Sequence, residues 1–116
     1  MPPTLMTPTT VILIPAFNEA DVIADVLADI SAVGDFPVIV IDDASTDNTV
    51  AIAEQAGATA IPLPAKLGAW GATQTGLRYA LRNGYTTAIS MDADGQHEAA
   101  SLAIILQPVS TGVADV

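Results

Sequence analysis

The segment Thr10-Val11-Ile12-Leu13-Ile14 is apolar after its first residue and rich in β-branched side chains, and Pro15 follows it. Polar and apolar residues do not alternate within it. A run of this kind is typical of a strand that is buried on both faces, as the strands of parallel sheets are. We therefore expect the first strand to end at Ile14 and to lie inside a layered α/β domain.

Strand and helix patterns alternate along the rest of the chain. The first helical pattern follows Asn18, which is its expected N-cap. Further strands are expected at 38–41, 58–63 and 86–91, and helices at 22–33, 48–56, 69–83 and 98–106. This alternation predicts an α/β fold over residues 10–107, with a mainly parallel sheet and helices on both faces. Residues 1–9 are expected to form a flexible leader and residues 108–116 a tail.

The composition excludes several classes of protein. The chain has 116 residues, of which 51% are hydrophobic and 14% charged, so it can form the core of one domain. It contains no cysteine, which excludes disulfides and zinc–thiolate sites. The formal net charge is −10, and only Lys66, Arg78 and Arg82 are positive. This balance argues against nucleic acid and anionic lipid surfaces as partners, and a phosphate-bearing ligand would need a cation to offset it.

Two carboxylates follow the last expected strand, in the segment Asp92-Ala93-Asp94-Gly95-Gln96. In extended backbone, Asp92 and Asp94 point to the same side, and Gln96 continues that period of two with a neutral oxygen. Oxygen ligands of this kind suit Mg²⁺ or Mn²⁺. The alternative is an acidic turn that closes a surface strand.

Polar segments follow all four expected strands, at 15–19, 42–43, 66–71 and 92–97. In open α/β sheets, ligands bind at the carboxyl ends of the strands. The agreement of four segments therefore predicts one ligand site at that edge of the sheet.

Individual residues at this edge allow more than one interpretation. Either Asp42 or Asp43 could accept a hydrogen bond from a nucleobase N–H, and the alternative is an Asx-turn beside one exposed acid. Glu19 could bind a ribose or a base, or complement a helix dipole. Lys66 could meet a pyrophosphate, or be a solvated surface lysine. Asp47 is the expected N-cap of the second helix.

Four motifs together resemble those of the inverting family 2 glycosyltransferases of GT-A fold, and in particular the dolichyl- and polyprenyl-phosphate sugar transferases. In chain order they are Ile14-Pro15-Ala16-Phe17-Asn18-Glu19, Val40 to Thr49, Gly68 to Leu77, and Met91-Asp92-Ala93-Asp94-Gly95-Gln96-His97. The resemblance covers about residues 10–107 and implies a Rossmann-like nucleotide-sugar-binding half.

The resemblance implies a ligand set. Mg²⁺ or Mn²⁺ would be held by Asp92, Asp94 and Gln96. The UDP- or GDP-sugar would be bound by Pro15, Ala16, Glu19, Asp42, Asp43, Lys66, Gly68, Asp92, Ala93 and Asp94. The acceptor would be a lipid phosphate, and the general base and acceptor-binding half of the family would lie outside this chain. The complete enzyme would then be cytoplasmic and associated with the membrane.

Two alternatives come from other classes of protein. One is a non-catalytic acidic α/β module that binds Mg²⁺, such as a receiver-like signalling domain. In receiver domains, however, the acid pair closes the first strand, whereas Asp42 and Asp43 follow the second. The other is an interaction module that forms a homodimer through an exposed sheet edge.

Overall fold

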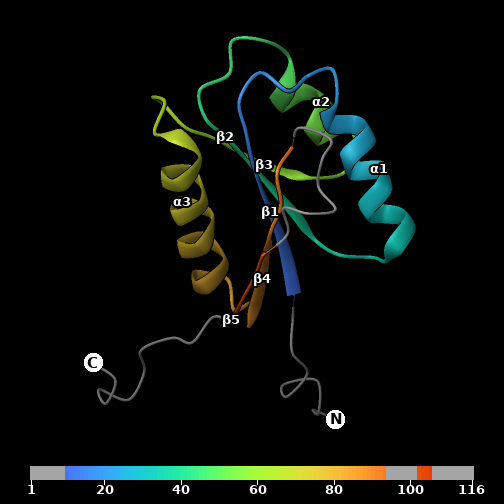
Figure 1. The fold of residues 1–116 in the computed structure, drawn as a ribbon, viewed down its shortest axis with the longest axis vertical. Helices are drawn as coiled ribbons and strands as arrows, with labels where there is room; N and C mark the ends of the chain where they lie inside the picture. Colours follow the sequence, from blue (N-terminus) through green and yellow to red (C-terminus); the bar gives the residue numbers. More distant parts are fainter. Residues whose placement is uncertain (1–9, 94–101, 106–116) are drawn as a thin grey trace.

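The computed structural model describes residues 10–93 and 102–105, and these form one sheet with helices on both of its faces (Figure 1). The elements in chain order are β1 (Thr10–Ala16), α1 (Ile23–Val33), β2 (Val38–Asp42), α2 (Thr49–Gln55), β3 (Thr59–Pro62), α3 (Gly68–Arg82), β4 (Thr87–Ser90) and β5 (Leu102–Ile105). The α/β class and the mainly parallel sheet predicted from the sequence are confirmed. No helix within these residues is long and apolar enough to cross a membrane.

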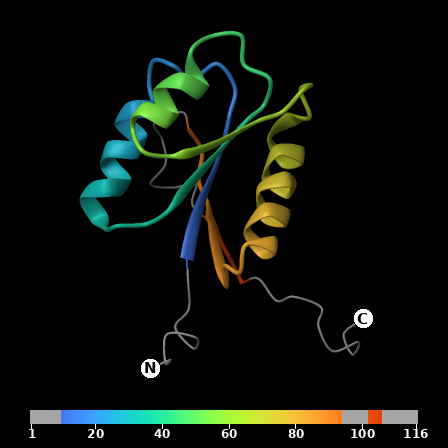
Figure 2. The ribbon, with the colours of Figure 1, turned by 180° about the vertical axis from the view of Figure 1, so that it is seen from behind.

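The strand order is β3-β2-β1-β4-β5, and the first four strands are parallel. The chain moves from β1 outward to β2 and β3, then crosses back to place β4 on the other side of β1. Right-handed crossovers that run in opposite directions put their helices on opposite faces. Figure 1 and Figure 2 accordingly show α1 and α2 on one side of the sheet and α3 on the other. The direction reverses between β1 and β4, and ligands bind at such a switch point in open α/β sheets.

The central strand β1 contributes to both hydrophobic layers. Ile12 and Ile14 pack with α1 and α2, whereas Val11 and Leu13 face α3. All four side chains are buried. The continuous apolar run therefore has the two-sided burial that its sequence predicts.

Helix α3 lies close to the sheet because small residues form its inner face. Ala72, Gly76 and Ala80 are all buried. A Cβ atom added at Gly76 would lie 2.7 Å from Cδ1 of Ile41 and 3.3 Å from Cδ1 of Leu13. The helix backbone therefore rests directly on β1 and β2.

Strand β1 continues through Pro15 to Ala16, so the prediction that it ends at Ile14 is wrong. In a strand that is paired on both sides, the N–H and C=O of one residue point to one neighbouring strand. Those of the next residue point to the other neighbouring strand. Ala16 O accepts from Asp43 N of the β2 side at 2.8 Å, and Leu13 O accepts from Met91 N of the β4 side at 3.0 Å. Pro15 therefore faces the β4 side, beyond the last paired residue of that strand, and its missing N–H costs no ladder bond.

Residues 102–105 form strand β5, so the prediction of a helix is wrong for them. This strand pairs antiparallel with β4, from Thr87 with Ile105 to Ser90 with Leu102. Short apolar runs fit a helix or a strand equally well. Here β4 has one edge that is not paired with β1, and residues 102–105 form a strand along that edge. Antiparallel edge strands are common on otherwise parallel sheets. The predicted leader 1–9 and tail 108–116 lie outside the described residues.

Candidate functional site

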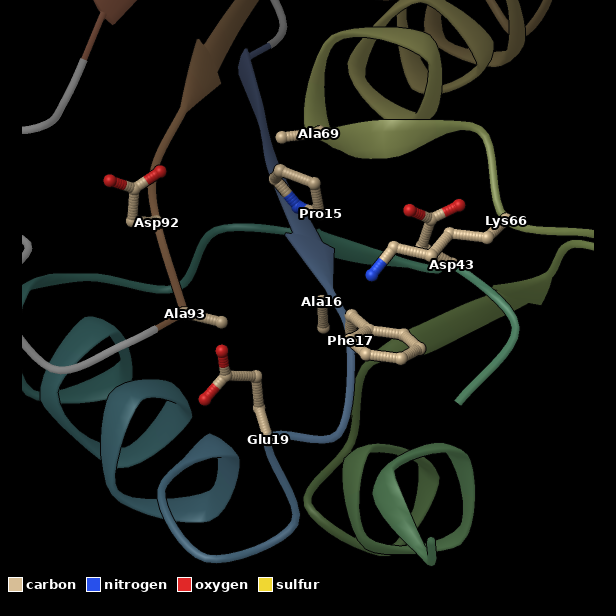
Figure 3. Close-up of a pocket in the computed structure, with 9 residues that line it drawn as sticks. All are labelled: Pro15, Ala16, Phe17, Glu19, Asp43, Lys66, Ala69, Asp92 and Ala93. Atoms are coloured by element: carbon tan, nitrogen blue, oxygen red, sulfur yellow. The ribbon is translucent and has the colours of Figure 1, made fainter. Parts of the chain in front are cut away.

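A cavity of about 310 Å³ opens at the carboxyl ends of the strands, at the switch point between β1 and β4 (Figure 3). Its lining comes from four separate segments of the chain: Pro15, Ala16, Phe17, Glu19, Asp43, Lys66, Ala69, Asp92 and Ala93. This volume lies at the lower end of the range for small-molecule sites. The structure therefore has a cavity at the strand ends, where the sequence predicts a ligand site.

The β1 side of the cavity combines small side chains with one acid. Pro15 and Ala16 end the strand, and their size leaves the space open. Figure 3 shows the Glu19 carboxylate directed into the cavity, toward Ala93 on the opposite wall.

Asp43 fixes the loop that follows β3. Its Oδ1 accepts from the Leu67 N–H at 2.6 Å, and its Oδ2 accepts from the Gly68 N–H at 2.9 Å. Asp43 as a residue is only 3% exposed, and charge-assisted bonds of this kind are among the stronger ones in proteins. Gly68 has φ +87°, a conformation that favours glycine. Gly68 is not among the residues that line the cavity, but it joins the loop that carries Lys66 to helix α3, which carries Ala69.

Lys66 brings the one positive charge among the lining residues that the structure describes. Its Nζ lies 3.3 Å from the centroid of the Phe17 ring, a cation–π contact. Among the described residues it forms no ion pair, so the ammonium group is available to an anion. Phe17 and Ala69 were not among the predicted site residues. Phe17 lies in a loop without periodicity, and Lys66, which it contacts, is distant in the sequence. No sequence pattern therefore indicates the contact between Phe17 and Lys66.

The β4 side of the cavity is formed by Asp92 and Ala93. Asp92 is exposed, and its carboxylate forms no hydrogen bond or ion pair with any described residue. Counting two residues on from the Leu13–Ser90 pair brings Asp92 level with Pro15. Asp94 and Gln96, the other predicted metal ligands, lie outside the described residues.

Asp42 and Asp43 have different environments. The side chain of Asp42 does not line the cavity, since neighbouring residues of a strand point to opposite faces. Its Oδ2 accepts from the Ser45 N–H at 3.0 Å, and its buried Oδ1 has no partner among the described residues. Of the two acids, Asp42 therefore stabilises the turn after β2, and Asp43 lines the cavity.

Asn18 links the loop after β1 to the loop after β2. Its N–H donates to Ser45 Oγ at 2.8 Å, and its Oδ1 accepts from the Thr46 N–H at 2.8 Å. The residue has φ +53°, which asparagine tolerates better than most residues. The prediction that Asn18 caps α1 is wrong, because the N-cap of that helix is Val22.

Asp47 strengthens the same junction. Its Oδ1 accepts from the N–H and the hydroxyl of Thr49, and its Oδ2 accepts from the Ala20 N–H at 3.2 Å. The Thr49 hydroxyl bond is the main cause that lowers the pKa of Asp47 below its ordinary value. The N-cap of α2 is Asn48, one residue later than predicted, but Asp47 still satisfies the first N–H of the helix.

The charges of the cavity indicate what it can hold. Among the described residues, three carboxylates line it, from Glu19, Asp43 and Asp92, against the single ammonium of Lys66. An anionic ligand alone would be repelled, so a cation must accompany it. No cluster of three potential metal ligands exists within residues 10–93 and 102–105, where Asp92 is the exposed oxygen donor of the β4 wall.

Known proteins are similar to this chain in sequence and in fold. The N-acetylglucosaminyltransferase of Methanococcus voltae that acts from UDP-N-acetylglucosamine on dolichyl phosphate is 31% identical, over 84% of this chain and 46% of its own. The undecaprenyl-phosphate mannosyltransferase of Micrococcus luteus is 34% identical, over 85% of this chain and 43% of its own. This chain thus spans less than half the length of both relatives.

A solved structure is also similar to this chain. Glucosyl-3-phosphoglycerate synthase from Mycobacterium tuberculosis, in complex with Mn²⁺, UDP and glucosyl-3-phosphoglycerate, superposes with a TM-score of 0.64 at 26% identity. The match covers 74% of this chain and 33% of that one. The sequence model of Glycosyl transferase family 2 matches residues 11–116. The chain belongs to glycosyl transferase family 2.

Proposed function

We propose that this chain is the donor-binding part of an inverting glycosyltransferase, and that the cavity between β1 and β4 binds a UDP- or GDP-sugar with Mg²⁺ or Mn²⁺. The observation that carries this proposal is the joint lining of one cavity by Asp92, Asp43, Lys66 and the end of β1. The mycobacterial synthase, a structural neighbour, was crystallised with Mn²⁺ and UDP, which supports the same ligand class here.

The nucleoside is assigned to the β1 and β2 side of the cavity. Each carboxylate oxygen has two lone-pair directions, so Asp43 keeps acceptor capacity beyond its bonds to Leu67 and Gly68. That capacity suits the N–H of a uracil or guanine base. Lys66 is assigned to the diphosphate, as the one cation among the described lining residues.

The donor set fits a hard divalent cation. Asp92 offers an oxygen with no described partner, and the chain supplies two further oxygen ligands in Asp94 and Gln96. When bound, such an ion neutralises charge on the departing nucleoside diphosphate. Asp92 and Lys66 would then hold the diphosphate from opposite sides of Pro15, as their positions in Figure 3 allow.

The acceptor is proposed to be a lipid phosphate, since the two curated relatives are named for dolichyl and undecaprenyl phosphate. An acceptor oxygen would form the new bond to the anomeric carbon, and the bond to the diphosphate would break with its electron pair on the diphosphate. Attack from the opposite face inverts the configuration. A phosphate acceptor is largely ionised at neutral pH, so it needs no general base from this chain.

Calorimetric titration of UDP and GDP with and without Mn²⁺ tests the proposal. We expect nucleotide binding that weakens at least about tenfold without Mn²⁺ or in Asp94→Asn and Asp92→Asn, because each loses a charge-assisted contact. Asp25→Asn is the matched control, since it removes an exposed carboxylate of α1 outside the cavity.

Two outcomes would contradict this assignment. Equal nucleotide binding by Asp94→Asn, with or without metal, would show that no metal bridge exists. Thermal stabilisation by Mn²⁺ or Mg²⁺ with no added effect of either nucleotide would show that the cavity binds a metal ion but not the proposed donor.

A further inference from the structure

A second hollow, of about 320 Å³, lies between α3 and the edge strand β3. It is lined by Ile61, Thr75, Arg78, Tyr79 and Arg82. None of these residues lines the cavity between β1 and β4. The hollow is therefore a separate feature, on the α3 face of the sheet.

Two of the three positive side chains of the protein meet at this hollow. Arg78 and Arg82 are four residues apart on α3, and like charges at this spacing destabilise a helix. The chain contains 13 acidic residues, yet neither guanidinium group forms a hydrogen bond or an ion pair with any residue of the described part. The position of Arg82 in the last turn is favourable for the helix dipole, but that of Arg78 is not explained in this way.

The other polar groups of the hollow are hydroxyls that can form hydrogen bonds, and no residue from the described ranges lines it with a carboxylate. The Tyr79 hydroxyl has no partner within the described ranges, so it can donate to a ligand. The Thr75 hydroxyl donates to Gly71 O at 3.0 Å. Ile61 supplies an apolar wall. The lining thus presents two guanidinium groups and a phenol, which is the donor chemistry that binds anions.

We propose that this hollow binds a small molecule that carries a phosphate group. Two guanidinium forks match the charge of a phosphate dianion and the arrangement of its oxygens. The volume suits a small ligand, and the net charge of −10 repels nucleic acid and anionic membranes. Ile61 and the Tyr79 ring can contact the organic part of a phosphate ester.

Amide NMR of the 116-residue chain, titrated with inorganic phosphate in the presence of EDTA, tests this inference. The chelator removes divalent ions, so the metal-dependent cavity does not contribute. We expect saturable shifts at Thr75 to Arg82 and at Ile61, without matching shifts at Pro15 to Glu19. A parallel titration with phenyl phosphate distinguishes the sources: tighter binding than inorganic phosphate identifies an organic phosphate, and equal binding identifies the free ion.

Arg78→Gln and Arg82→Gln should each weaken phosphate binding at least about tenfold, since each removes a charge-assisted contact. Gln55→Glu is the matched control, because it lowers the net charge by the same unit on the exposed end of α2. Retained circular dichroism spectra verify that the variants fold. Absence of shifts in the parent chain, or equal binding by the arginine variants and Gln55→Glu, would overturn the proposal.

Discussion

The ammonium group of Lys66 lies 3.3 Å from the centroid of the Phe17 ring, so the loop after β3 is in contact with the loop after β1. The contact positions this cation of the cavity lining on the wall opposite Asp92. Such contacts contribute about 0.5–1 kcal/mol at exposed sites. Phe17 therefore acts mainly by orienting the charge of Lys66.

Replacement of Lys66 should weaken binding of UDP in the presence of Mn²⁺. We expect Lys66→Met to lose about tenfold in affinity, and Phe17→Leu to lose about two- to fivefold because only the orientation of the charge suffers. Calorimetry measures both. Gln55→Glu lowers the net charge by the same unit on the exposed end of α2 and should leave UDP affinity unchanged. Equal losses in Lys66→Met and Gln55→Glu would mean that only net charge matters.

Removal of the negative charge of Asp43 should release the loop before α3. In Asp43→Asn, the side-chain NH₂ replaces one of the two oxygens, so either the Leu67 N–H or the Gly68 N–H loses its acceptor. We expect this loss to lower the free energy of unfolding by about 1–3 kcal/mol. Urea denaturation measures that cost, and hydrogen exchange at Leu67 and Gly68 should become faster. Asp25→Asn, on the exposed face of α1, provides the comparison. Unchanged exchange at both amides would contradict this role.

A side chain at Gly76 should separate α3 from the sheet. We expect Gly76→Ala to destabilise the protein by about 1–3 kcal/mol, because the new Cβ would lie 2.7 Å from Cδ1 of Ile41, which is fully buried. Ile41→Val removes that Cδ1 atom, so the double variant should recover part of the loss. Gln74→Ala, at an exposed position of the same helix, should be nearly neutral. Strictly additive single and double variants would disprove the direct contact.

Stability should depend on pH through Asp47. Its pKa is lowered in the folded state, chiefly by the Thr49 hydroxyl, so its contribution is present above the ordinary aspartate pKa of about 3.9. The contribution is lost as the pH falls through the lowered value. Asp47→Asn should therefore be less stable than the parent at pH 7, and this difference should shrink in acid.

Thermal unfolding between pH 7 and pH 2 measures this effect. Thr49→Val removes the hydroxyl and should reduce the acid dependence, whereas Thr49→Ser keeps the hydroxyl and should preserve it. A parent and Asp47→Asn with parallel pH profiles would contradict the assignment.

Much of the architecture follows from local patterns. Continuous apolar runs predict β1 and β2 because strands buried on two faces need no polar alternation. The location of the cavity follows from the rule on strand carboxyl ends, and that rule requires only the strand order of α/β units. Pro15, Glu19 and Asp43 were predicted at this edge and do line the cavity.

Other features depend on contacts that are distant in sequence. Residues 102–105 become a strand because β4 offers them an unpaired edge, which a helical pattern cannot reveal. Pro15 stays in β1 because its nitrogen faces past the end of β4. The different environments of Asp42 and Asp43 were open to prediction, since successive residues of a strand point to opposite faces.

The reversal of strand order between β1 and β4 also bears on how the protein acquires its site. One wall of the cavity forms near the beginning of the described domain and the other near its end. A partly folded chain in which β4 has not docked would lack this cavity. A ligand bound there would stabilise the finished fold alone, by mass action, and could report the completion of folding.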